Sequence, residues 1–253
     1  MLTYHAVEPG HGAVFVDPGL FAEHLDVIVA TGARVTTVSE LAAALRAGSL
    51  EDRTVAITFD DGVASVARVA APLLHERNLR ATVFCVAGRL GARSDWQSAR
   101  PEAPTFELAT AAELADLTER GWEIGCHGMT HAPLISHEAQ AVHHEVVDAH
   151  RLLEDVVGVP VRSFAYPYGA LPSVCAERAV RATYESACTT HLGLASGSTD
   201  VYSIPRVDAY YVRRTRDLRR VLEGRLGVLP VRRLVGSARR VFRKDYAVSE
   251  RLQ

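Results

Sequence analysis

The segment TVAITFDDG, residues 54–62, indicates the fold and the chemistry of this chain more directly than any other stretch. Residues 54–59 are a short run of apolar and β-branched residues, which is typical of a strand. Asp60 and Asp61 follow it directly, before Gly62. An isolated Asp-Asp-Gly is usually a turn, but two carboxylates are a poor structural choice at the end of an apolar strand. The segment therefore predicts a strand that carries functional acids at its carboxyl end.

Short extended runs and amphipathic segments alternate on both sides of this strand. Further strands are expected at residues 2–7, 34–38, 81–86, 122–126, 162–165, 186–189 and 202–207, and helices at 20–30, 65–77, 110–120, 136–157 and 171–183. Such alternation is typical of a parallel sheet covered by helices. About seven β-α units favour a closed or nearly closed barrel over a small open sheet, so the predicted fold class is an α/β, TIM-like barrel.

Polar residues gather where the expected strands end, which is where such a barrel carries its active site. Asp60 and Asp61 follow one strand, the segment HGMTH (127–131) follows a second, and YPYG (166–169) follows a third. His5 lies in the first expected strand. Acids, imidazoles and a backbone shaped by proline and glycine are therefore expected at one end of the barrel.

Two imidazoles and one carboxylate form a ligand set for a divalent metal ion that leaves positions open for water. The ion lowers the pKa of that water, and a second carboxylate beside it can take the water's proton. Because neighbouring side chains on a straight strand diverge, Asp60 and Asp61 cannot easily both bind the ion. Where the strand turns through Gly62, one carboxylate can bind metal while the other faces the substrate.

Composition excludes several classes of protein. The chain has 253 residues, of which 48% are hydrophobic and 23% charged, and this is ordinary for a globular protein. No apolar run approaches the ~18 residues of a membrane span. The opening residues, MLTYH, lack the features of a secretory signal, and the four cysteines form no CxxC pair. We therefore expect a cytoplasmic protein with reduced thiols.

The net charge of −2 conceals a division of the chain. Residues 212–244 hold eleven arginines and one lysine against two acids, a net +10, so the rest of the chain carries −12. We expect a catalytic domain at 1–211 and a basic, amphipathic helical tail at 212–253. The helical stretches 213–225 and 231–243 suit peripheral contact with an anionic membrane on its inner face, or docking on the acidic barrel. No recognition motif accompanies the charge, so nucleic-acid binding is not expected.

The three polar segments together resemble the motifs of the polysaccharide deacetylase family, the NodB-homology domain of carbohydrate esterase family 4. TFDDG (58–62) resembles its first motif, EIGCHGMTH (123–131) its second and FAYPYG (164–169) its third. The resemblance covers roughly residues 2–211. It implies a distorted (β/α) barrel that removes N-acetyl groups, or less often O-acetyl groups, from sugars with a divalent metal ion, commonly zinc.

The resemblance also implies roles for individual residues. Asp60 would be the general base, and Asp61, His127 and His131 would hold the metal ion. The backbone N–H of Tyr168 would help to bind the oxyanion, which is the electrostatic stabilisation that such a hydrolysis needs.

The chain departs from the family pattern at two positions. Ala165 stands where the third motif often has an arginine that orients the base, and Arg206 is the candidate replacement. The last motif, Leu-x-His, which supplies the catalytic acid, is missing. His5, in TYHAV (3–7), resembles the first strand of a permuted subset that includes deacetylases of poly-N-acetylglucosamine, and it is the candidate acid. Tyr166 and Pro167, together with Arg206, would form the substrate side of the site.

The expected function is therefore a metal-dependent deacetylase acting on an N-acetylated sugar or glycan. An O-acetyl esterase or a hydrolase of cyclic amides on the same scaffold remains open, as does an inactive carbohydrate-binding barrel, against which the retained Asp60 argues. Without an export signal, a lipid-linked or nucleotide-linked sugar fits better than an extracellular polymer. Trp96, in the expected insertion loop 91–105, is a candidate either for packing or for stacking on a sugar.

Overall fold

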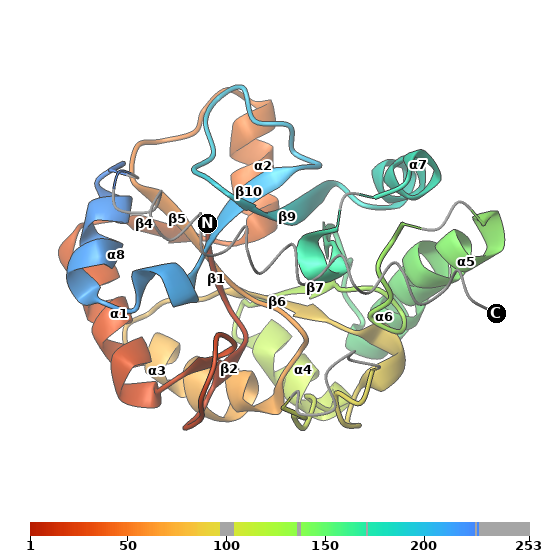
Figure 1. The fold of residues 1–253 in the computed structure, drawn as a ribbon, viewed down its shortest axis with the longest axis horizontal. Coiled ribbons are helices and arrows are strands. Elements are labelled where there is room, and N and C mark those ends of the chain that lie inside the picture. The colour runs from red at the N-terminus through yellow and green to blue at the C-terminus, as the bar shows by residue number, and fades with distance from the viewer. Residues whose placement is uncertain (97–103, 136–137, 171, 226, 228–253) are drawn as a thin grey trace.

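Seven parallel strands close into a barrel in the computed structural model, which describes residues 1–96, 104–135, 138–170, 172–225 and 227 (Figure 1). β1 closes the barrel because it pairs with β5 on one side and with β10 on the other. The barrel strands are β1 (Leu2–Tyr4), β5 (Thr54–Phe59), β6 (Thr82–Cys85), β7 (Glu123–Cys126), β8 (Ser163–Ala165), β9 (Ser186–Leu192) and β10 (Ile204–Asp208). The predicted α/β barrel is confirmed.

Two further pieces of sheet lie outside the closed ring. β4 (Arg34–Thr36) pairs with the first half of β5. β1 pairs with the second half of β5, along the same edge of the strand. The single strand expected at 2–7 is interrupted, because β2 (Ala6–Val7) leaves the barrel and pairs with β3 (Phe15–Val16). His5 lies at this break, between β1 and β2.

Helices surround the barrel, as the alternating sequence pattern predicts (Figure 1). The helical segments are α1 (Pro18–Ala30), α2 (Val38–Arg46), the π-helix Val66–Ala70 with α3 (Ala71–His75), α4 (Ala111–Glu119), α5 (Ala139–His143), the π-helix His144–Asp148 with α6 (Ala149–Val157), α7 (Val174–Thr183) and α8 (Thr215–Leu222). Single 3-10 turns lie at Ala87–Arg89, Pro167–Gly169 and Ala209–Val212.

α2 corrects the sequence analysis, which treated residues 34–38 as extended and expected no helix after them. The Thr37 hydroxyl accepts from the backbone N–H of Glu40, and the Glu40 carboxylate accepts from the backbone N–H of Thr37, which together form a capping box. The same device, at Thr110 and Glu113, begins α4 as expected. Ser136, the expected cap of the long helix that ends at Val157, lies outside the described residues.

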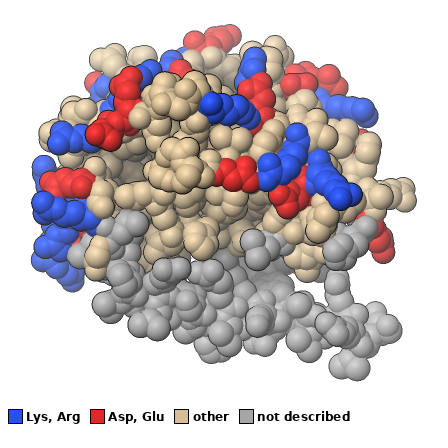
Figure 2. Space-filling model, turned by 90° about the horizontal axis from the view of Figure 1, so that it is seen from above, with Lys and Arg blue, Asp and Glu red and all other residues tan. Residues whose placement is uncertain are grey.

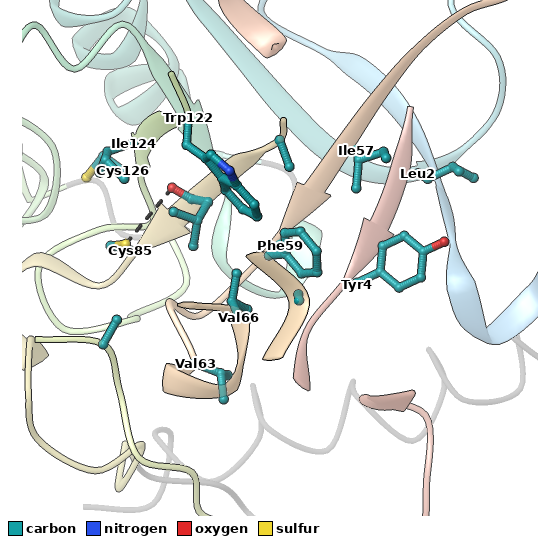
Figure 3. Close-up of a cluster of buried hydrophobic side chains, with 14 of the residues drawn as sticks. Leu2, Tyr4, Ile57, Phe59, Val63, Val66, Cys85, Trp122, Ile124 and Cys126 are labelled. Atoms are coloured by element: carbon teal, nitrogen blue, oxygen red, sulfur yellow. Dashed lines mark hydrogen bonds between the residues drawn. The ribbon is translucent and has the colours of Figure 1, made fainter. Parts of the chain in front are cut away.

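The side chains of β5 alternate between two environments, and this decides where its acids point. Val55, Ile57 and Phe59 face the helices and belong to the main hydrophobic core. Figure 3 shows part of this core, in which Phe59 stacks on Trp122 at 5.8 Å between ring centroids. The alternate residue Thr58 faces the inside of the barrel, and the next residue on that face is Asp60.

α8 packs against α1, although it belongs to the segment predicted to be a separate tail. Val212, Leu218 and Val221 are buried in the main core. The boundary at residue 211 stays a prediction, and the stretch 231–243 lies outside the described residues. No helix in the described part of the chain combines the length and the apolar character that crossing a bilayer requires.

Candidate active site

The backbone takes an unusual form at the ends of three strands. Asp61, His131 and Tyr168 have positive φ angles of 71°, 66° and 58°. Residues other than glycine seldom adopt this region, and they persist there when the surrounding structure holds them. Among the described residues, Arg53 and Asn78 share this conformation away from the site, so three of the five such positions are predicted site residues.

Asp60 forms a buried ion pair with Arg206 across the barrel. Arg206 donates from Nη1 to Asp60 Oδ1 and from Nη2 to Oδ2, each at 2.7 Å. Nε of Arg206 donates to the carbonyl oxygen of Thr189 at 2.9 Å, and Thr58 Oγ1 lies 3.3 Å from Nη1. Two-point contacts of this kind fix both the position and the angle of a carboxylate. The structure thus places Arg206 against Asp60, as the sequence analysis expected of a residue that replaces the missing arginine.

The ion pair keeps Asp60 ionised in spite of its burial. Burial alone raises the pKa of this carboxyl group, but the charge of Arg206, with smaller contributions from His127 and His5, lowers it below its usual value. The side chain of Arg206 is only 1% exposed. It therefore orients Asp60 from inside the barrel, and the substrate-binding role predicted for it is corrected to this one.

Asp61 turns away from Arg206 and meets the two histidines of the second motif. Its Oδ1 lies 3.5 Å from Nε2 of His127 and 3.2 Å from Nε2 of His131. One ligand atom from each residue lies within 4.8 Å of the others, and this is the group in the described chain that could hold a metal ion. Burial raises the pKa of Asp61, but hydrogen bonds to both histidines hold it well below its usual value.

The tautomer of His127 suits a metal ligand. Nδ1 lies 2.7 Å from the backbone carbonyl oxygen of Ala165, which can only accept a hydrogen bond. Nδ1 therefore carries the proton, and the lone pair of the neutral ring is on Nε2, which faces Asp61. Burial lowers the pKa of His131, whereas the hydrogen bond to Asp61 and the charges of Asp60 and Asp61 raise the pKa of His127 in spite of its burial. The donor set thus fits a zinc ion with open positions.

Glu145 holds the turn between the two histidines, and the sequence analysis missed it. Its Oε2 accepts from the backbone N–H of Met129 at 2.9 Å and of Thr130 at 3.1 Å, and Oε1 accepts from the Thr130 hydroxyl. A side chain at Gly128, where φ is 85°, would come within 2.8 Å of the same carboxylate. Glu145 lies in a helical stretch rich in acids and histidines, so nothing in the local pattern distinguishes it.

The remaining predicted residues lie around these two groups. His5 follows Tyr4, whose carbonyl oxygen accepts the Asp60 N–H at 3.0 Å, and it contributes to lowering the pKa of both Asp60 and Asp61. The 3-10 turn at Pro167–Gly169 follows β8, and the ring of Tyr168 meets His131 edge-on at 4.5 Å. Pro167 is buried.

Tyr166 is corrected, because its side chain points away from the site. Its ring packs edge-on against Phe164 at 5.4 Å and is 2% exposed in the main core. Ala165, between them, faces the inside of the barrel with Cys188 and Ile204. A strand that places Ala165 inside places Tyr166 outside, so its side chain does not face a substrate.

Fold and site together define a (β/α) barrel with two adjacent acids at the carboxyl end of its strands. The family model for polysaccharide deacetylase matches residues 47–187, more than half of the chain. The chain belongs to the polysaccharide deacetylase family, whose members hydrolyse amide or ester bonds.

Individual relatives agree with this assignment. YxkH of Bacillus subtilis (strain 168), a protein assigned to the polysaccharide deacetylases, is 23% identical over 82% of this chain and 70% of its own length. The structure of IcaB from Ammonifex degensii superposes with a TM-score of 0.73 and 23% identity over 88% of this chain and 94% of its own. The structure of Streptococcus pyogenes deacetylase PplD in complex with acetate superposes with a TM-score of 0.71. It is 23% identical in sequence over 82% of this chain and 90% of its own. At these identities the two structures show the fold.

Proposed function

We propose that this protein is a metal-dependent deacetylase that removes N-acetyl groups from an N-acetylated sugar or glycan. One observation carries the proposal: a carboxylate held by a buried arginine stands next to a carboxylate that faces two histidines. Asp61, His127 and His131 would hold the ion, most suitably Zn²⁺. When bound, zinc would polarise the acetyl carbonyl and make a water molecule more acidic.

The chain's own residues would carry the proton transfers. Asp60 takes the proton of the attacking water, and Arg206 keeps it ionised and aimed for this purpose. The backbone N–H of Tyr168 stabilises the negative charge that develops on the acetyl oxygen. His5 gives a proton to the departing amine, so that acetate and a free amino sugar leave.

Acetate release from a panel of N-acetylated and O-acetylated glycans, measured with and without a chelator, tests this function. We expect release from N-acetylated sugars that stops with chelator and returns with added zinc. Release only from O-acetylated glycans would replace the proposal with an esterase. No release from any member of the panel by metal-loaded protein would favour the carbohydrate-binding alternative.

We also propose peripheral contact with an anionic membrane surface, supported by the exposed face of α8. Arginines gather on this side of the molecule (Figure 2), and the exposed ones are Arg214, Arg216, Arg219, Arg220 and Arg225. The apolar face of α8 is buried in the main core beside α1, so the contact would be electrostatic rather than insertion. Pelleting with anionic vesicles at low salt, lost at high salt, is the expected result, and no pelleting at low salt would refute it. A cytoplasmic location stays a prediction.

A further inference from the structure

The two histidines beside Asp61 are held in different ways. Nδ1 of His127 has a hydrogen bond to the carbonyl oxygen of Ala165. Nδ1 of His131 is buried, and among the described residues it has no hydrogen-bond partner. A metal-binding histidine normally donates its second nitrogen to an acceptor, which fixes the angle of its ring. His131 lacks this support, so some other contact must orient it.

Two aromatic rings enclose His131 instead. Trp96 stacks on it with 4.4 Å between ring centroids and 27° between planes. Tyr168 meets it edge-on at 4.5 Å and 68°. His131 is 6% exposed, so these contacts replace solvent on its faces. Packing on the ring faces therefore adds to the contact of Nε2 with Asp61 in defining the angle of the His131 ring.

The segment before Trp96 is held by the loop that precedes α4 and by the adjacent 3-10 turn at Ala87–Arg89. Ser94 donates its N–H to the carbonyl oxygen of Phe106 at 2.9 Å, and its hydroxyl accepts from the N–H of Phe106 at 2.8 Å. The carboxylate of Asp95 pairs with Arg89 at 2.9 Å. Trp96 therefore extends from an anchored segment, and its position over His131 is set by these contacts.

We propose that Trp96 is a positioning residue of the metal centre: its indole holds His131 in the orientation that binds the ion. The proposal rests on the function proposed above, in which Asp61, His127 and His131 bind metal. It makes Trp96 part of the metal centre, although its side chain offers no ligand. Loss of a group that orients a ligand typically weakens metal binding about 10-fold or more.

Metal affinity of three variants, measured by competition with a chromophoric chelator for Zn²⁺ or Co²⁺, tests the proposal. Trp96→Ala should weaken binding by about 10-fold, whereas Trp96→Phe keeps a stacking ring and should stay close to the wild type. Arg93→Ala, in the same segment but exposed and hydrogen-bonded to the carbonyl oxygen of Thr105, is the matched control and should bind normally. Unchanged affinity in Trp96→Ala would overturn the proposal.

Tryptophan fluorescence gives a second test that does not depend on Trp96→Ala. The chain has two tryptophans, and Trp122 lies at the beginning of β7, at the other end of that strand from His127. Co²⁺ should quench wild-type fluorescence strongly and that of Trp96→Phe only weakly. Equal quenching of both proteins would overturn the proposal even if Trp96→Ala failed to fold. A wild type that binds no metal would overturn the proposed function as well, whereas a metal-binding wild type with normal Trp96→Ala overturns only the role of Trp96.

Discussion

Asp60 and Asp61 are neighbours in the chain, yet they belong to two different regions of the site. Asp60 continues the inward face of β5, and both of its oxygens are bound by Arg206. Asp61 has a left-handed backbone, and this turns its carboxylate toward His127 and His131. Alternation along the strand places the first, and the turn after it places the second.

One sequence motif can thus supply two chemical roles when the surroundings of its residues differ. Burial alone would raise the pKa of both carboxyl groups. In both cases charged or hydrogen-bonded partners outweigh burial, so that the pKa lies below its usual value. The partner of Asp60 is a permanent cation, so this carboxylate stays ionised and oriented. The partners of Asp61 are imidazoles, whose nitrogens would bind a metal ion in their unprotonated form. The first region suits a base and the second suits a ligand.

The largest expected effect on turnover follows from substituting Asp60 alone. Asp60→Asn removes the base but keeps the shape, so turnover should fall by about 10²- to 10⁴-fold. The metal affinity of this variant should stay near that of the wild type, because the side chain at position 60 is not expected to touch the ion. Steady-state acetate release and chelator competition measure the two quantities. Turnover within a few fold of the wild type would remove Asp60 from the mechanism.

The next effect concerns His5, the proposed acid that complements Asp60. His5→Ala should leave the metal content intact and lower turnover by about 10²-fold or more, because the departing amine then lacks a proton donor. The control is His75→Ala, which changes a histidine on α3, in a part of the fold that carries none of the predicted site residues. Near-normal turnover in His5→Ala would assign the acid to another group.

A smaller and more specific effect is expected when the orienting cation is lost. In Arg206→Met the pKa of Asp60 should rise, because burial then acts without the opposing charge. Asp60 then becomes protonated at higher pH, so the acidic limb of kcat/KM should move upward by about one to three pH units. If the acidic limb of the pH profile of kcat/KM stayed at the same pH in this variant, the role of Arg206 would be contradicted. The variant should also unfold at lower temperature, because it leaves a buried charge unpaired.

The smallest effect is expected on the Asp61 side, through the turn that Glu145 holds. Glu145→Gln loses acceptor capacity for the N–H groups of Met129 and Thr130, and should weaken metal binding by about 10-fold. Glu123→Gln is a matched control: its carboxylate accepts from Ser39, Thr82 and Ser163 at the amino ends of the strands. That variant should lose stability without losing metal affinity. Equal affinities in the two variants would show that the turn does not depend on Glu145.

Sequence patterns predicted those parts of the site that depend on strand ends. β5 was predicted with its observed bounds, and the acids and histidines after β5 and β7 meet as expected. Strand alternation could have predicted that Tyr166 points outward, since Ala165 belongs inside. Glu145 and the contact between Trp96 and His131 could not be predicted, because both join segments whose approach is set only by the folded barrel.

A crystal structure of the zinc-loaded protein, with the ion located by its anomalous scattering, tests the division between Asp60 and Asp61 most directly. The expected result is one ion bound by Asp61, His127 Nε2 and His131 Nε2, with Asp60 still paired with Arg206 and outside ligand distance. An ion bound by Asp60, or one that binds away from Asp61, would contradict the account.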